Sequence, residues 1–228
     1  MKQLTRATLK TALNLLVFAV IGTAILAATF NLTHSRIAQS EQAEKLKLIN
    51  QVVPESLYDN ELIKDTLVIP ASEQLGTEQD SVAYRGRLKG QPAVVVLEVI
   101  APDGYSGKIS MIVAINHAGA VTGVRVVTHK ETPGLGDYID FAKNKWISLF
   151  GGASHERYKE DDWKVRKDGG QFDYMAGATI TPRAVVKAVH KALHYFEDNR
   201  DKLFAVSAPA VESTGQTEGA SKQKAGAQ

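Results

Sequence analysis

The side-chain hydroxyl of Thr179 is placed where it could carry a phosphate. It belongs to the run Asp173-Tyr174-Met175-Ala176-Gly177-Ala178-Thr179-Ile180-Thr181-Pro182, in which a small Gly-Ala segment precedes a strong helix start. We expect Thr181 to be the N-cap of this helix and Pro182 its first residue. The amino end of a helix offers unpaired N–H groups and the positive end of a dipole, which suit a phosphate. The Thr179 hydroxyl, just outside this anion site, could hold the phosphate covalently as well.

An ordinary capped helix start is the alternative interpretation of this run, since Ser and Thr are common at such positions. The surrounding pattern favours the chemical interpretation. Asp-x-x-x-Gly-Ala-Thr resembles the acceptor motif of proteins with covalently bound FMN, in which the threonine forms a phosphoester with the flavin phosphate. The resemblance implies that Thr179 is the flavinylated residue and that the modifying enzyme reads Asp173.

A second segment with chemical potential is Glu131-Thr132-Pro133-Gly134-Leu135-Gly136, which follows an expected hairpin. Two glycines around a leucine permit close backbone approach to a flat ligand, and the proline stiffens the entry. A plain strand-to-helix turn is the alternative. A dinucleotide fingerprint is excluded, because the third glycine and the surrounding parallel strand–loop–helix unit are missing.

Together, and in this order behind one apolar N-terminal stretch, the two motifs resemble the G subunits of the Rnf (or Rsx) ion-translocating electron-transport complexes. The C subunit of the sodium-pumping NADH:quinone oxidoreductase is a close relative. The likeness runs from the apolar stretch to about Phe204, and it includes the segments 49–54 and 104–107. It implies FMN, covalently bound, together with integral membrane and redox partner subunits and a flavin transferase that installs FMN from FAD.

The resemblance also assigns roles by position. Thr179 would bear the FMN, and the neighbours that would cradle its phosphate are Gly177, Ala178, Ile180 and Thr181. The isoalloxazine ring would be lined by Glu131, Thr132, Gly134, Leu135 and Gly136. Lys167 is the candidate for the pyrimidine side, where a lysine would favour the reduced, anionic flavin; a solvated loop charge is the alternative. Ala176 departs from the serine or threonine often found there, which puts one minor hydrogen bond in doubt.

On this basis we expect a subunit that relays electrons through FMN, without a substrate of its own. A membrane-tethered FMN sensor without a relay role is a second hypothesis, and a cofactor-free scaffold is a third. The composition is compatible with an organic electron carrier. The absence of cysteine excludes structural disulfides, cysteine-ligated iron–sulfur clusters and thioether-linked haem. The net charge of +2, with scattered basic residues, gives no sign of nucleic-acid binding.

The amino end predicts a membrane anchor. Lys2, Arg6 and Lys10 precede an apolar stretch over residues 12–30, which is close to the ~20 residues that a spanning helix needs. A cleaved signal peptide is the alternative, but Ala27-Ala28-Thr29 is a poor cleavage site. The charge pattern predicts a single-pass protein of the bacterial inner membrane, with a cytoplasmic N-terminus at residues 1–11 and the remainder in the periplasm.

Beyond the anchor we expect an α+β protein with an antiparallel sheet and flanking helices. A connecting helical segment would occupy residues 31–65, the FMN-binding domain residues 66–204, and a disordered tail residues 205–228. Within the domain the sequence predicts a buried strand at 90–100, a hairpin of strands 108–115 and 121–128, a helix at 138–150 and a last helix from Pro182 to about Asp198. The stretch 66–76 is ambiguous.

Two further groups are assigned no chemistry. His190 and His194 lie one helical turn apart, which is metal-ligand spacing, but Lys191 stands where a metalloprotease signature needs glutamate. We therefore expect exposed helix surface and no metal. The charged run 156–167 is expected to be a solvated surface loop rather than a docking patch.

Overall fold

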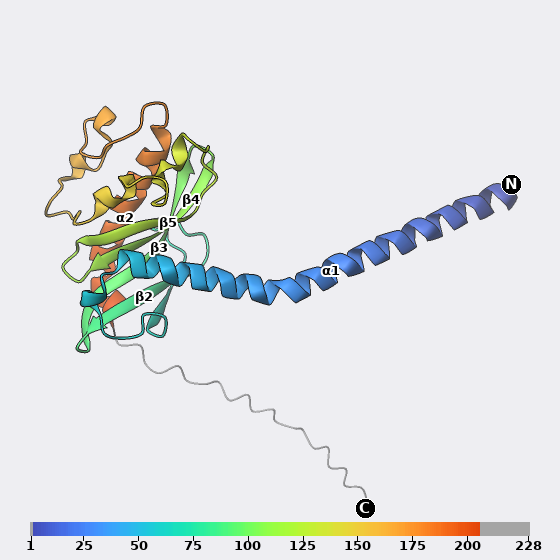
Figure 1. Cartoon of the computed structure of the whole chain (residues 1–228), viewed down its shortest axis with the longest axis horizontal. Helices are drawn as coiled ribbons and strands as arrows, with labels where there is room; N and C mark the ends of the chain where they lie inside the picture. Colours follow the sequence, from blue (N-terminus) through green and yellow to red (C-terminus); the bar gives the residue numbers. More distant parts are fainter. Residues whose placement is uncertain (1, 206–228) are drawn as a thin grey trace, which may run out of the picture.

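The computed structural model describes residues 2–205, except the side chains of residues 2–8 and 35–46. Its first element is one long helix, α1 (Lys2–Val52). The helix contains a candidate membrane span of 26 residues, Leu9–His34, in which an 18-residue window has a mean hydropathy of 2.2 and no residue is buried. The expected anchor and connecting helix are thus parts of one helix, which leads away from the folded domain (Figure 1). It ends before Pro54, as the sequence predicts. The predicted disordered tail lies, from residue 206 onward, outside the described residues.

The described part of the domain is built on a five-stranded sheet in which every strand pairs with its neighbour in sequence. The strands are β1 (Thr66–Ile69), β2 (Ser81–Leu88), β3 (Gln91–Gly104), β4 (Gly107–Asn116) and β5 (Val121–Thr128). All four pairings are antiparallel. The predicted hairpin is therefore confirmed, and the predicted strand at 90–100 is the first part of β3. β3 and β4 meet in a tight turn at Tyr105 and Ser106, where Gly104 pairs with Gly107.

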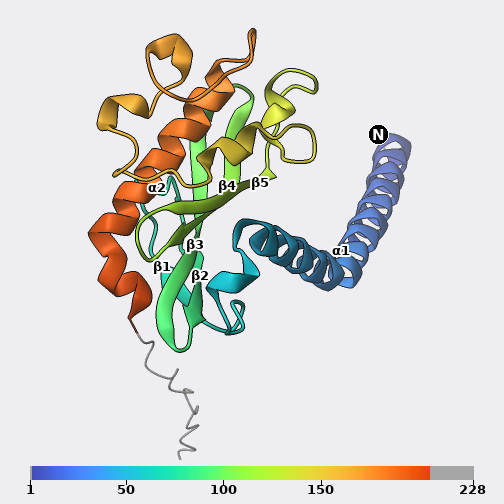
Figure 2. The same cartoon turned by 60° about the vertical axis from the view of Figure 1, so that its left-hand side comes forward.

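Both faces of the sheet are covered, because alternate residues of β3 and β4 enter two different apolar clusters. Val95, Leu97 and Val99 face the larger core. Val94 and Val96 face a smaller one, which the end of α1 closes with Ile49, Val52 and Val53. This alternation is the period of two expected of strands. Figure 2 shows the sheet between α2 and the end of α1.

The helix α2 (Ile180–Phe204) covers the face of the larger core. Its buried positions include every apolar residue that the sequence pattern predicts: Ala184, Val185, Ala188, Val189, Ala192, Leu193 and Phe196. The helix starts two residues before the predicted first position, Pro182, and ends beyond the predicted Asp198. Because a proline lacks only an N–H that the first turn leaves unpaired in any case, Pro182 is compatible with the third position.

The segment between β5 and α2 contains short 3-10 turns, namely η2 (Gly136–Ile139), η3 (Trp146–Phe150), η4 (Glu160–Asp162) and η5 (Arg166–Asp168). The predicted helix at 138–150 is wrong. Asp140 accepts a hydrogen bond from the amide of Ala142, and Asn144 accepts one from the amide of Trp146. Such local side-chain bonds compete with the helical pattern and break it into two turns.

Two strands were not predicted. β1 lies in the ambiguous stretch, and β2 carries Arg85 and Arg87, whose charges conceal its alternation. Arg85 is only 2% exposed, with one guanidinium nitrogen 2.6 Å from the carbonyl of Ala205 and an ion pair to Asp65. A charged residue paired in this way is tolerated inside a protein. The fold class is α+β, as predicted.

Candidate functional site

Three segments meet at the carboxylate of Glu131, which is 4% exposed. Its Oε2 accepts a hydrogen bond from the Thr181 hydroxyl at 2.6 Å, and its Oε1 accepts one from the amide of Ser106 at 3.1 Å. Ser106 belongs to the turn between β3 and β4, Glu131 follows β5, and Thr181 lies in the first turn of α2. Hydrogen bonds to a buried charged group are stronger than neutral ones. Glu131 therefore fixes the start of α2 against the sheet.

The packing around Glu131 leaves no room for side chains on two neighbouring glycines. A Cβ added to Gly136 would lie 2.6 Å from Oε2 of Glu131 and 2.9 Å from the Thr181 hydroxyl. A Cβ on Gly104 would lie 2.9 Å from Oε1 of Glu131 and 2.3 Å from the carbonyl of Gly107. Both glycines are needed for close approach rather than for a special backbone angle.

The loop that carries Gly134 is held in shape by hydrogen bonds between its own residues. The amides of Leu135 and Gly136 both donate to the carbonyl of Thr132 at 3.1 Å, and the amide of Gly134 donates to Asp137 at 2.8 Å. Asp137 also forms an ion pair with Lys143. The hydrogen bond from Lys143 holds the pKa of Asp137 below its usual value, so the carboxylate stays ionised and the loop stays closed at neutral pH.

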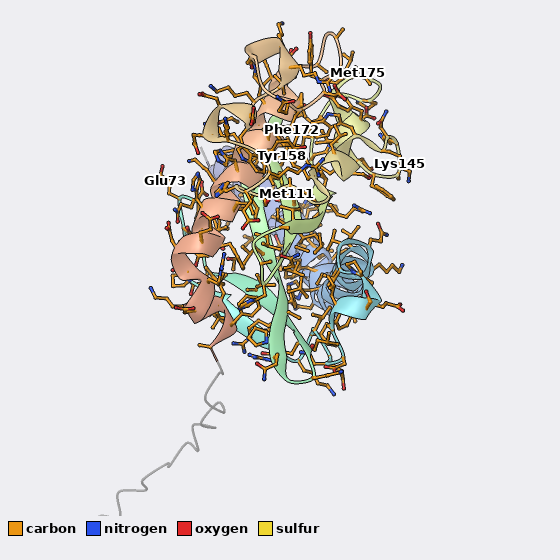
Figure 3. All side chains as sticks on the ribbon, turned by 90° about the vertical axis from the view of Figure 1, so that its left-hand side faces the viewer. Glu73, Met111, Lys145, Tyr158, Phe172 and Met175 are labelled. Carbon is orange, nitrogen blue, oxygen red and sulfur yellow. The ribbon has the colours of Figure 1, made fainter. Side chains whose placement is uncertain are left out.

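The segment before α2 is held by two aromatic residues of the 3-10 turns. The Trp146 indole N–H donates to the carbonyl of Asp173 at 2.7 Å. The Tyr138 hydroxyl accepts from the amide of Met175 at 3.3 Å and lies 3.5 Å from the carbonyl of Ala178. Burial raises the pKa of Tyr138, which keeps the phenol protonated. Met175 lies at the end of the domain where this segment turns towards α2 (Figure 3).

Thr179, rather than the expected Thr181, is the N-cap of α2, and its side chain makes no capping hydrogen bond. Thr181 cannot cap the helix because it is buried with its hydroxyl bonded to Glu131. The first backbone bond of the helix runs from Arg183 to the Thr179 carbonyl at 3.3 Å. The amides of Ile180 and Thr181 precede that bond, as is usual in a first turn. The Thr179 hydroxyl is thus left for other chemistry beside unpaired donors.

Several predicted site residues offer open space for a flat ligand. Gly134 and Gly177 both have positive φ, +76° and +89°, and an added Cβ at either would meet no atom within 4 Å. Leu135 and Ile180 are 48% and 46% exposed. Apolar side chains left open beside backbone donors fit a flavin, which combines a flat ring with a phosphate. Thr132 is also exposed, whereas Ala178 is buried.

Three of the predicted site residues are buried and lie against one another: Glu131, Gly136 and Thr181. They therefore support the site from beneath, and the structure does not present the Glu131 carboxylate to solvent as a ring contact. Sequence reasoning gave no role to Ser106, Tyr138 or Trp146. The contacts of these residues cross 25 to 40 positions of the chain, so no local pattern predicts them.

Two charged candidates lie at the surface. Asp173 is 53% exposed and lies 3.1 Å from the guanidinium of Arg166, so an enzyme could reach it. Lys167 is exposed on η5 and makes no hydrogen bond or ion pair with any described residue. Its neighbour Asp168 binds Arg183 of α2 with two hydrogen bonds, at 2.5 and 2.6 Å. η5 is thereby held near the start of α2, although Lys167 is not brought into contact with the other candidates.

Two family models match this chain, one over its N-terminal helix and one from the end of β3 into α2. The family model of the FMN-binding domain matches residues 104–194, which include every candidate site residue, and that of the RnfG N-terminal region matches residues 1–52. A protein of Vibrio atlanticus, named as the G subunit of an ion-translocating oxidoreductase complex, is 47% identical over 86% of this chain and 93% of its own length. Proteins of the same name from Shewanella piezotolerans and Pseudomonas aeruginosa are 43% and 44% identical, over 90% and 88% of this chain and 96% and 94% of theirs.

Proposed function

The chain belongs to the family of the G subunits of ion-translocating oxidoreductase complexes, and on that premise we propose that it relays electrons through FMN bound covalently to Thr179. Membership makes it an FMN-binding subunit of a multi-subunit complex with a helix suited to span a membrane. The attachment site and the relay are our proposal. The observation that carries it is the uncommitted Thr179 hydroxyl at the N-cap of α2.

The geometry around Thr179 suits a phosphoester. The amides of the first helical turn and the helix dipole stabilise a negative charge beside the hydroxyl. Gly177, with φ of +89° and open space at its Cα, leaves room for the phosphate oxygens. In the reaction that we propose, a flavin transferase directs the Thr179 oxygen at the flavin-side phosphorus of FAD. The new O–P bond replaces the pyrophosphate bond, AMP leaves, and the hydroxyl proton is released.

The remaining candidates position the ring and shield it. Leu135 and Gly134 offer an exposed apolar side chain and an open backbone, and Thr132 a hydroxyl at the same loop. We propose that Glu131 and Gly136 position the other site residues without contacting the ring, because they join this loop to the first turn of α2. Lys167 is proposed to approach the pyrimidine side through η5, which the Asp168–Arg183 pair holds near that turn.

When bound, FMN can exchange one or two electrons, which suits a relay between other subunits of the complex. The protein would hold the FMN in a fixed position. A covalent bond would prevent loss of the cofactor, and α1 would keep the FMN-binding domain close to a bilayer. We propose that the N-terminus (1–11) is cytoplasmic, that the anchor (12–30) crosses the bacterial inner membrane, and that the segment 31–65 leads to a periplasmic FMN domain (66–204). Redox partners would then be integral subunits of the same complex.

The test is covalent flavin on Thr179. The full-length chain is co-produced with a flavin transferase, denatured, and examined by in-gel flavin fluorescence and intact mass. We expect one attached FMN, located by peptide mapping on Thr179. Thr179→Ala should lose all covalent flavin and remain folded, because the hydroxyl makes no capping bond.

Ser148→Ala provides the matched control, since it removes an exposed hydroxyl from η3 that belongs to none of the candidate site residues. It should carry one FMN, as the unchanged chain does. Retention of covalent flavin by Thr179→Ala, or an unmodified mass of the unchanged chain beside an active transferase, would refute the assigned attachment.

A further inference from the structure

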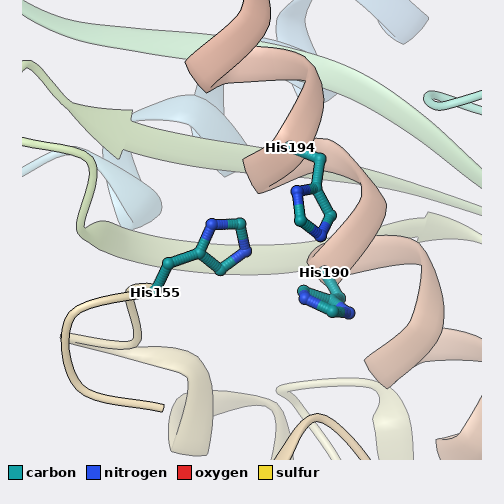
Figure 4. A group of neighbouring side chains, drawn as sticks. All are labelled: His155, His190 and His194. Carbon is teal, nitrogen blue, oxygen red and sulfur yellow. The ribbon is translucent and has the colours of Figure 1, made fainter. Parts of the chain in front are cut away.

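Three histidines of the domain lie together, outside the proposed FMN site. His190 and His194 are on α2, and His155 comes from the segment between η3 and η4. One ring nitrogen from each lies within 4.8 Å of those of the other two. The ring centroids are 4.4 to 5.1 Å apart, and Figure 4 shows the three rings turned towards a common centre. The expectation of exposed helix surface is wrong for His190, whose side chain is only 12% exposed, whereas the His194 side chain is 42% exposed.

Two nitrogens of this cluster are buried without a hydrogen bond to any described residue: Nε2 of His155 and Nε2 of His190. A buried polar atom without a partner costs free energy, so such atoms call for an explanation. Nε2 of His190 lies 3.3 Å from the Glu160 carboxylate, but not in the geometry of a hydrogen bond. A ligand that accepts a lone pair from each ring would satisfy both nitrogens at once.

The surroundings also match a cation site. Nδ1 of His155 lies 2.8 Å from the Glu197 carboxylate, which would fix this ring with its proton on Nδ1 and its lone pair on Nε2. A carboxylate behind the histidine is the usual outer support of a metal ligand. Oε2 of Glu160 lies 3.3 and 3.6 Å from Nε2 of His190 and His194, and 75% of its side chain is exposed. Glu160 thus lies at the open side of the cluster, where a fourth ligand is needed.

We propose that His155, His190 and His194 bind a divalent late transition metal such as Zn²⁺, with Glu160 or water as the fourth ligand. A tetrahedral zinc with three imidazole nitrogens at ~2.0–2.1 Å places these nitrogens roughly 3.4 Å apart, so the rings, whose nitrogens lie within 4.8 Å of one another, would draw together on binding. The ligand set of nitrogen and one oxygen suits Zn²⁺, Cu²⁺ and Ni²⁺, and it disfavours Mg²⁺ and Ca²⁺, which prefer oxygen.

The proposed metal would act as a structural cross-link. The segment between β5 and α2 has no α-helix or β-strand of its own among the described elements, and the chain contains no cysteine for a disulfide. Aromatic rings contribute to its packing: Trp163 stacks on His190 at 4.8 Å and on Phe172 at 5.3 Å. Tyr158 and Phe172 are labelled in Figure 3 beside α2. A metal bound to His155 and to α2 would fasten this segment to the helix.

The test uses the full-length chain in detergent, without flavin and without a polyhistidine tag, so that its result does not depend on FMN. Zinc binding is measured by calorimetry, and thermal unfolding is followed with and without Zn²⁺. We expect one Zn²⁺ per chain and a melting temperature that rises with Zn²⁺ but not with Mg²⁺. Glu197→Gln should weaken binding by about 10–100-fold, and loss of the ligand in His194→Ala should weaken it more.

His194 is the chosen ligand because its half-exposed ring allows replacement without emptying the core, whereas the His190 side chain is only 12% exposed and is stacked on Trp163. His117→Ala is the matched control: it removes an exposed histidine outside the cluster and should bind Zn²⁺ as the unchanged chain does. The metal-free melting temperatures verify that each variant folds. No Zn²⁺ binding to the unchanged chain, or equal binding by His194→Ala, would overturn the proposal.

Discussion

At the scale of single residues, Glu131 has the largest consequence for the candidate site, because one buried carboxylate joins three segments. Its partners, Ser106 and Thr181, lie 25 positions before it and 50 positions after it. Neither the expected N-cap role of Thr181 nor the expected ring contact of Glu131 describes this arrangement. The Thr181 hydroxyl is used to anchor α2, and this leaves the adjacent Thr179 as the N-cap with an unused hydroxyl.

Glu131→Gln should therefore weaken the fold and the site together. The amide keeps the size of the side chain but offers one acceptor where two are used, so a buried donor loses its partner. We expect the free energy of unfolding to fall by about 1–3 kcal/mol, measured by urea denaturation with tryptophan fluorescence. Covalent flavin loading, followed by in-gel fluorescence, should also slow.

Glu156→Gln is the matched control, because it makes the same chemical change at an exposed loop residue. Its unfolding free energy should stay within about 0.5 kcal/mol of that of the unchanged chain. If the two variants were equally stable, Glu131 would not be the joint that its hydrogen bonds indicate.

The individual site residues can be predicted from the sequence more easily than the contacts that these residues make. The motifs around Thr179 and Glu131 can be found by inspection, since residue type and local spacing define them. Tyr138 and Trp146, which hold the segment before Thr179, have no such motif. Their roles depend on where the 3-10 turns place them, and local spacing carries no information about that placement.

At the scale of elements, α1 is both the candidate membrane span and part of the domain. Its last turns bury Ile49 and Val52, each 1% exposed, against the face of the sheet that α2 does not cover. Thr122 and Arg125 of β5 add hydrogen bonds to Val52 and Gln51. The helix that leaves the span is thus docked on the sheet before the chain turns at Pro54.

Ile49→Ala should destabilise the domain, although the residue belongs to the helix of the anchor. Removing a fully buried isoleucine leaves a cavity between α1 and the sheet, and such changes cost about 2–5 kcal/mol. Urea denaturation of the full-length chain in detergent measures this loss. Asn50→Ala, which alters the exposed neighbour on the same helix, should change the stability by less than about 0.5 kcal/mol. Equal stability of the two variants would mean that α1 does not pack on the sheet in solution.

Elements with a clear hydrophobic period were predictable and those with mixed patterns were not. The hairpin of β4 and β5 and the buried stripe of α2 follow directly from periods of two and 3.6. β2 was missed because Arg85 is buried in an ion pair at a position that the pattern treats as exposed. The segment after β5 has a helical apolar pattern, but Asp140 and Asn144 bind the backbone locally and divide it.

At the scale of the whole molecule, the absence of cysteine allows a direct test of the proposed topology. Ser148→Cys places one thiol on the exposed surface of the domain, and Thr5→Cys places one before the candidate span. In intact spheroplasts a membrane-impermeant maleimide should label Ser148→Cys, and it should label Thr5→Cys only after lysis, because the positively charged end stays inside. The unchanged chain is the unlabelled control. The reverse labelling pattern would contradict the proposed orientation.

The simple order of the sheet determines when the proposed attachment of flavin would become possible. Each strand pairs with the strand just made, so a chain that folds in the direction of its synthesis can form the sheet from local contacts, which form fast. The face below α2 stays uncovered until the last quarter of the chain arrives, and that quarter also contains Thr179 and Thr181. The proposed acceptor, Thr179, therefore reaches its place in the closing step of folding. A transferase that reads the finished site would modify only complete chains, and attached flavin would then mark a domain whose folding is finished.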